Sequence, residues 1–225
     1  MSGTKNDLIV SYLTLRQMIG WIGLLMPFVV RIGASALEGI YSNGSISAYY
    51  YTGMRDVFVS TLVLVGALLA CYRTPSWHDN VVSVVAGIAA VGIGLFPMDR
   101  TFATNILTRY PETARGACYI NNGLLGFHMT FVTIFFALAC YIVLCRFSAH
   151  TPTYPSHEKL KRNKVYKVCG TIMVLCCVAI GIIKFSNGDR SIFWPETIAV
   201  ATFATAWLVK GQTILKDKSS ATTPR

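Results

Sequence analysis

Six apolar runs restrict what this chain can fold into. They cover residues 18–37, 57–72, 81–97, 124–145, 165–183 and 193–209. A perpendicular transmembrane helix needs roughly 20 apolar residues, so the shorter runs require polar ends that lie within the membrane interface or the bundle. Only 13% of the residues are charged, against roughly 25% in a soluble domain. The sequence therefore predicts an all-α protein, a polytopic transmembrane bundle of six helices.

Basic residues indicate which ends of the runs face the cytoplasm. The connection between the fourth and fifth runs is short and carries KLKRNK at 159–164. Lys and Arg concentrate in cytoplasmic connections, so this segment predicts that both termini are cytoplasmic. We expect residues 1–210 to form one transmembrane domain and the polar segment 211–225 to form a disordered cytoplasmic tail. This pattern favours a multi-pass protein of a bacterial inner membrane.

Composition and residue placement argue against several other kinds of protein. The net charge is +10, but the basic residues lie beside apolar runs, where they meet anionic lipid headgroups, so nucleic acid is not an expected partner. All of the cysteines except Cys118 lie in or beside apolar runs, where Cys acts as a small hydrophobe. His128 is the only histidine at the predicted outer ends, so no metal and no cofactor are expected. Arg31 interrupts the first run, which favours a retained helix over a cleaved signal peptide.

Ionisable residues gather at the predicted outer ends of the six runs. In hydrocarbon such residues are costly, so they either pair inside a bundle or reach the interface. Apolar neighbours flank Arg31, Asp56 and His128, which favours a shared polar pocket. Lys184 and Glu196 are interpreted as interfacial anchors. At least two of the three tyrosines at 49–51 are interpreted as part of an aromatic belt at the membrane interface.

A polar pocket in the outer half of a bundle suggests that the protein binds or senses a lipid or another amphiphile. Arg31 or Arg55 would meet the anionic part of a membrane lipid, and Ser47 and Tyr50 complete the predicted ligand-binding set. An alternative is a lipid hydrolase in which His128 is the general base, with Asp56 as its orienting partner and Asp99 beside them. A structural or assembly role is the further alternative.

Two segments and one histidine also carry a family resemblance. SISAYYYTGMRDVFV at 45–59, FPMDR at 96–100 and the early-helix His128 resemble a bacterial family of six-helix integral membrane proteins of unknown function. The resemblance spans roughly residues 16–145, and it implies the fold rather than an activity. The positions that match are Tyr49, Tyr50, Arg55, Asp56, Pro97, Asp99 and His128.

A fainter likeness is to the membrane hydrolases that include alkaline ceramidases and progestin-receptor-like proteins. Those proteins use Ser, Asp and His near one membrane face. This chain lacks the paired histidines of their last helix and has no seventh run. The departure argues against a metal-dependent amide hydrolase.

Overall fold

The computed structural model describes residues 3–41, 44–98, 126–149, 156–186 and 191–215. These residues form six long helices, and no strand occurs among them. The helices are α1 (Gly3–Glu38), α2 (Arg55–Cys71), α3 (Trp77–Leu95), α5 (Phe127–Tyr141), α7 (His157–Phe185) and α8 (Phe193–Lys210). A 3₁₀ turn, η1 (Ser47–Tyr51), precedes α2, while a π-helical turn, η4 (Ile142–Arg146), and α6 (Phe147–Ala149) continue α5. The prediction of an all-α fold is confirmed.

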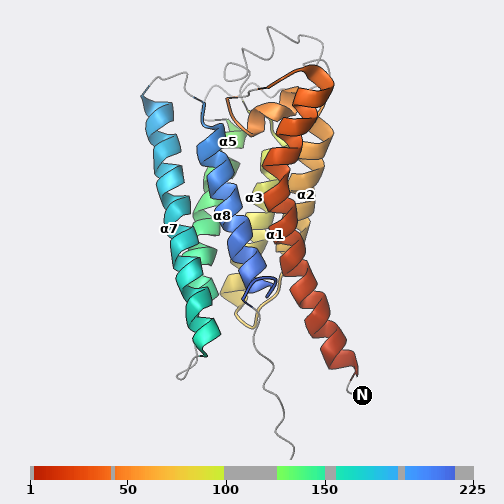
Figure 1. Ribbon diagram of the computed structural model, residues 1–225, viewed down its shortest axis with the longest axis vertical. Coiled ribbons are helices and arrows are strands. Elements are labelled where there is room, and N and C mark those ends of the chain that lie inside the picture. Colours follow the sequence, from red (N-terminus) through yellow and green to blue (C-terminus); the bar gives the residue numbers. More distant parts are fainter. Residues whose placement is uncertain (1–2, 42–43, 99–125, 150–155, 187–190, 216–225) are drawn as a thin grey trace, which may run out of the picture.

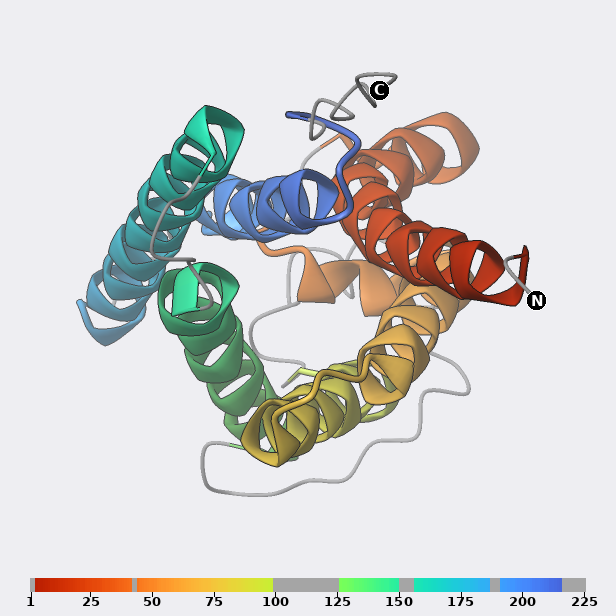
Figure 2. The same ribbon diagram turned by 90° about the horizontal axis from the view of Figure 1, so that it is seen from below.

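The six helices form a closed ring in chain order (Figure 2). Each helix packs against its neighbours along the chain, and α8 closes the ring against α1. The Gln17 side chain donates a hydrogen bond from Nε2 to the Gly211 carbonyl at 2.9 Å. The two terminal helices therefore meet at one end of the bundle, which we name the inner end; the outer end is the one at which α1 finishes and α8 begins (Figure 1).

Four helices are long and apolar enough to cross a membrane. These segments are Tyr12–Glu38, Trp77–Leu95, Phe127–Ala149 and His157–Phe185. They are compatible with a multi-pass membrane protein, because apolar helices of this length match the thickness of a bilayer. The helix α2 has 17 residues and α8 has 18, and six spans with cytoplasmic termini stay a prediction.

The observed helices follow the predicted runs, but α1 and α7 extend beyond them. At the inner end α1 begins at Gly3 and α7 at His157, so KLKRNK at 159–164 is helical rather than a loop. The tail predicted from residue 211 begins inside the described part of the chain. Residues 211–215 form a turn whose Leu215 carbonyl accepts a 3.0 Å hydrogen bond from Arg162. Residues 99–125 and 216–225 lie outside the described residues.

Small residues let the helices approach closely, as expected for packing in lipid. Gly66 of α2 faces Gly87 of α3, and a Cβ atom placed on Gly66 would lie 2.6 Å from the Gly87 carbonyl oxygen. A Cβ on Gly20 of α1 would meet the Leu208 side chain of α8 at 2.6 Å. Both contacts leave no room for a methyl group, so glycine sets the spacing of these two helix pairs.

Candidate functional site at the outer end

The segment that leads into α2 folds into the outer end of the bundle. In Figure 2, η1 lies within the ring rather than around its edge. The exposed fractions of Tyr49, Tyr50 and Tyr51 are 0%, 3% and 0%, and the Tyr51 hydroxyl donates to the Met98 carbonyl at 2.6 Å. These tyrosines are therefore core residues, and their interpretation as an aromatic belt at the interface is wrong.

His128 joins this segment to the first turn of α5. Its side chain is 5% exposed. Nδ1 lies 2.8 Å from the Phe96 carbonyl oxygen, and Nε2 lies 3.1 Å from Oγ of Ser47. A carbonyl can only accept, so Nδ1 carries a hydrogen, and in the neutral imidazole the lone pair on Nε2 accepts from the Ser47 hydroxyl. The Ser47 hydroxyl is therefore hydrogen-bonded to an imidazole whose tautomer is fixed by the Phe96 carbonyl on the other side of the ring.

The Phe96 carbonyl can accept a hydrogen bond from His128 because α3 ends at Leu95, one residue earlier. The last helical bond at this end runs from the Phe96 N–H to the Gly92 carbonyl at 2.9 Å. Pro97 follows, and proline has no N–H to continue the helix. The carbonyls of a helix end need partners from outside the helix, and here the imidazole of His128 is such a partner.

Asp56 does not take the place that the sequence suggested for it. Its side chain is exposed in the first turn of α2, while the Phe96 carbonyl and the Ser47 hydroxyl occupy the two ring nitrogens of His128. The prediction that Asp56 orients the imidazole is wrong. Asp99 lies outside the described residues.

Glu196 is the main polar residue whose role the sequence analysis missed. Its carboxylate accepts hydrogen bonds from Ser45 Oγ at 2.9 Å and from the Ile46 N–H at 2.6 Å. Ser45 Oγ in turn accepts from the Ser47 N–H at 3.2 Å. The first turn of α8 and the first turn of α5 therefore hold the same short segment from two sides. A carboxylate that follows Pro195 at the start of an apolar run was the only signal in the sequence.

Two cations lie against aromatic rings at the outer end. The Arg31 guanidinium lies 4.9 Å from the ring centre of Phe193 and 5.4 Å from that of Trp194. Arg55 lies 4.6 Å from the ring centre of Tyr50 and donates to its hydroxyl at 3.1 Å. Rings stabilise a cation through their negative faces without removing its charge.

A hollow of about 390 Å³ opens beside Arg31. Its lining comes from the last turns of α1 and the residues after it: Arg31, Ile32, Ser35, Ala36 and Tyr41. Ile32 is 67% exposed and Tyr41 is 74% exposed, so apolar surface surrounds the cation. A cation next to exposed apolar surface suits a ligand that carries both an anionic and an apolar part.

The contacts connect the hollow to the Ser47–His128 pair. Arg31 lies on Phe193, whose ring packs edge-on against Tyr49 at 6.1 Å between ring centres. Tyr49 belongs to η1, the turn that begins at Ser47. Within the part of the chain that the structure describes, no group of three or more His, Cys, Asp or Glu side chains is placed to hold a metal ion.

Comparisons with known proteins found no match for this chain. The chain matches no protein-family model, no curated protein and no solved structure. The two family resemblances drawn from the sequence therefore stay predictions, and the residues themselves carry the functional argument.

Proposed function

We propose that this chain is a six-span protein of a bacterial inner membrane whose outer end binds or senses an anionic amphiphile. The observation that carries the proposal is the position of Arg31, which lies over two aromatic rings beside a hollow with apolar walls. Within the described part of the chain, Arg31 contacts aromatic rings and forms no ion pair with a carboxylate. Contact with aromatic rings leaves the charge of a guanidinium in place, and such a charge suits the anionic headgroup of a lipid.

The closed ring supports the six-span topology. In Figure 1, α2 and α8 run alongside the four longer apolar helices, between the same two ends of the bundle. The basic segment 159–164 lies near the inner end, so the positive-inside rule puts that end in the cytoplasm. Reporter fusions test this topology. Fusions at the two termini should report the cytoplasm, and a fusion within 99–125 should report the opposite side.

A titration with defined lipids tests the binding site. The purified protein in mild detergent is titrated with phosphatidylglycerol or phosphatidylcholine, and bound lipid is counted by native mass spectrometry. The parent should prefer the anionic lipid, and Arg31→Gln should weaken that binding about tenfold because the charge-assisted contact is lost. Lys164→Gln makes the same charge change on an exposed position of α7 and should leave binding unchanged. Equal binding by the parent and Arg31→Gln would contradict the proposal.

A second candidate function, ester hydrolysis, is favoured by the Ser47–His128 contact. A hydroxyl 3.1 Å from a neutral imidazole nitrogen has the separation expected of a nucleophile and its general base. Ser47 Oγ would attack the ester carbonyl carbon while its proton moves to Nε2 of His128. The alcohol would leave with that proton, and water would then cleave the acyl-serine to release a carboxylic acid. Ser47 is half-buried rather than fully enclosed, which gives a substrate a route to its oxygen.

The two functions differ in what a variant does to the ligand. Under binding alone, Ser47→Ala and the parent retain the same lipid in the same chemical form. Under hydrolysis, Ser47→Ala retains an intact ester that the parent converts to products. Incubation with a total lipid extract, followed by measurement of free fatty acid, separates the two outcomes.

A further inference from the structure

A second cavity lies at the inner end of the bundle, away from Ser47 and His128. Its volume is about 180 Å³, and its lining comes from α1, the turn between α2 and α3, α3, η4, α6 and α8. Four cationic side chains line it, each from a different element: Arg16, Arg73, Arg146 and Lys210. Asp79 is the only carboxylate among its described lining residues.

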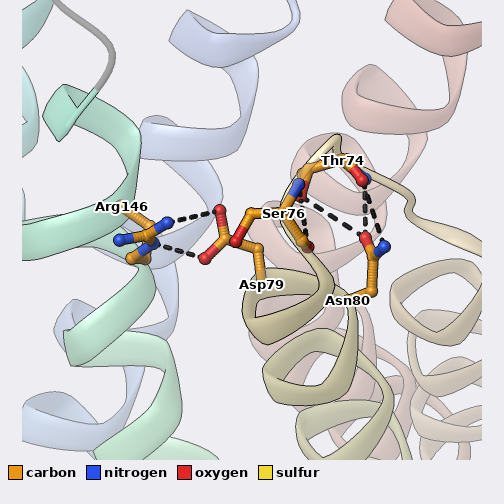
Figure 3. Close-up of polar contacts among 5 residues, drawn as sticks. All are labelled: Thr74, Ser76, Asp79, Asn80 and Arg146. Atoms are coloured by element: carbon orange, nitrogen blue, oxygen red, sulfur yellow. Dashed lines mark hydrogen bonds and ion pairs between the residues drawn. The ribbon is translucent and has the colours of Figure 1, made fainter.

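Arg146 already pairs with this carboxylate. Asp79 is 8% exposed, and one of its oxygens accepts a 3.0 Å hydrogen bond from the Arg146 guanidinium while the other forms an ion pair with Nε (Figure 3). The turn before Asp79 is tied down as well, because the Thr74 N–H donates to Oδ1 of Asn80 at 2.6 Å. One side of the cavity is therefore a fixed, neutralised pair.

Within the described part of the chain, Arg16 and Lys210 donate hydrogen bonds to neutral groups. Arg16 donates to the Lys210 carbonyl at 3.3 Å and to the Tyr72 hydroxyl at 3.4 Å. Its Nε is buried and has no hydrogen-bond partner among the described residues. The Lys210 ammonium donates to the Phe147 carbonyl at 3.1 Å. Carbonyl and hydroxyl groups satisfy donors without cancelling charge, so these contacts leave the charge of the Arg16 guanidinium in place.

Aromatic rings surround these two cations and keep much of their surface from water. Arg16 lies 4.5 Å from the ring centre of Tyr12, which stacks on Tyr72 at 5.4 Å. Lys210 lies 5.1 Å from the ring centre of Phe147. Cations removed from water are costly unless an anion accompanies them. Binding of an anion in the cavity would therefore be favourable, because the anion offsets the free-energy cost of holding these cations away from water.

The positive-inside rule does not account for this arrangement. That rule concerns basic residues in the connections beside a membrane, and Lys161, Lys164 and Lys167 on α7 fit it because their side chains are exposed. Arg16 and Lys210 are instead half-buried and line the cavity. They belong to the first and last helices of the ring, which makes the cavity a property of the folded bundle.

We propose that the inner-end cavity binds a phosphate group through Arg16 and Lys210. Phosphate oxygens suit this lining because guanidinium and ammonium groups both donate charge-assisted hydrogen bonds to them. Pockets for drug-sized ligands occupy roughly 300–1,000 Å³, so a smaller cavity fits one headgroup or ion. The phosphate arrives either on a phosphomonoester lipid of the cytoplasmic leaflet or as free inorganic phosphate. This site is independent of the one proposed at the outer end.

Binding to the full-length protein in mild detergent tests the proposal. The probes are inorganic phosphate, the soluble short-chain lipid dihexanoyl phosphatidic acid, and dihexanoyl phosphatidylcholine as the lipid control. Isothermal titration calorimetry at constant ionic strength gives the affinity for each. Arg16→Gln and Lys210→Met should each weaken binding of the phosphate probe about tenfold. Lys164→Gln removes the same charge outside the cavity and should bind as the parent does.

The results of these titrations either support or overturn the proposal. Binding of phosphatidic acid alone supports a lipid headgroup as the source, and binding of both probes supports free phosphate as a sufficient ligand. Absence of binding of either probe by the parent overturns the proposal, and this result does not depend on how the variants fold. Binding that Lys164→Gln weakens as much as Lys210→Met also overturns it, because the general surface charge would then be the cause.

Discussion

Ser47 Oγ and Nε2 of His128 lie 3.1 Å apart although the two residues are separated by 81 positions in the chain. The contact joins the segment before α2 to the first turn of α5. The imidazole also forms a hydrogen bond with the Phe96 carbonyl at the end of α3. The His128 side chain therefore connects α5, the end of α3 and the segment before α2. The contact therefore has a structural effect with or without a ligand at the outer end.

Loss of the imidazole should cost more stability than loss of the serine hydroxyl. His128→Ala leaves the Phe96 carbonyl without its partner, and a buried group left unpaired costs about 1–3 kcal/mol. Ser47→Ala removes one neutral hydrogen bond, worth about 1 kcal/mol. Titration with SDS in mixed micelles measures the free energy of unfolding of both variants. A smaller loss for His128→Ala than for Ser47→Ala would contradict this account of the contact.

Glu196→Gln should destabilise the outer end. The carboxylate accepts from the Ser45 hydroxyl and from the Ile46 N–H, and an amide offers only one oxygen to these donors. A buried donor left without its acceptor costs about 1–3 kcal/mol, and the substitution should lower the free energy of unfolding by a similar amount. Glu158→Gln, at the other end of the bundle, serves as the control. It removes a pair with Lys161 one helical turn away, and such exposed pairs contribute only about 0.5 kcal/mol or less. Equal effects would argue against a special role for Glu196.

Gly87→Ala should push α2 and α3 apart. The added methyl would meet the Gly66 carbonyl, and overpacking of this kind costs about 1–3 kcal/mol. Gly181→Ala on α7 is the control, because a Cβ there meets no atom within 4 Å. The thermal midpoint of unfolding in detergent should fall for Gly87→Ala alone. A fall of the same size in both variants would mean that the close approach of the two helices is not the cause.

The Asp79–Arg146 pair should show coupling in a double-mutant cycle. Asp79→Asn leaves the guanidinium without its counter-ion and should cost about 1.5–3 kcal/mol. In the background of Arg146→Gln the same change should cost less, because the partner has already been removed. The free energy of unfolding of the four proteins gives the coupling. Additive losses would show that the pair is not a stabilising contact.

Hydrophobicity alone predicted the helices well. The run at 193–209 corresponds to α8 (Phe193–Lys210), and the run at 57–72 to α2 (Arg55–Cys71). Apolar stretches end where polar residues begin, so their bounds are visible in a single sequence. The extensions of α1 and α7 at the inner end were missed because their residues are polar. Hydropathy does not distinguish a polar segment that continues a helix from a polar loop.

The outer site was predicted by its residues but not by its contacts. Ser47 and His128 were both candidates, yet Asp56 was expected where a backbone carbonyl lies. Sequence reasoning compares side chains, and it gives no sign that the end of α3 leaves the Phe96 carbonyl free beside the imidazole. The exposure of Asp56 follows from the rotation of α2 about its axis, which packing against α1 and α3 decides.

The inner cavity was missed for a different reason. Arg16 and Lys210 are among the basic residues beside apolar runs, which the sequence analysis interpreted as meeting anionic lipid headgroups. Their shared position becomes visible only when α1 and α8 meet, 194 positions apart in the chain. Contacts between the first and last helices of a ring leave no local pattern in the sequence.

The central claim is that the outer end of the bundle holds a ligand. Untargeted lipid mass spectrometry of the protein purified in mild detergent tests it most directly, with the parent compared with Arg31→Gln and Ser47→Ala at matched folded yield. The account predicts a lipid that the parent carries and Arg31→Gln loses, with Ser47→Ala keeping it unchanged or as an uncleaved ester. The same lipid profile in the parent and in both variants would contradict the account and leave Arg31, Ser47 and His128 with a packing role.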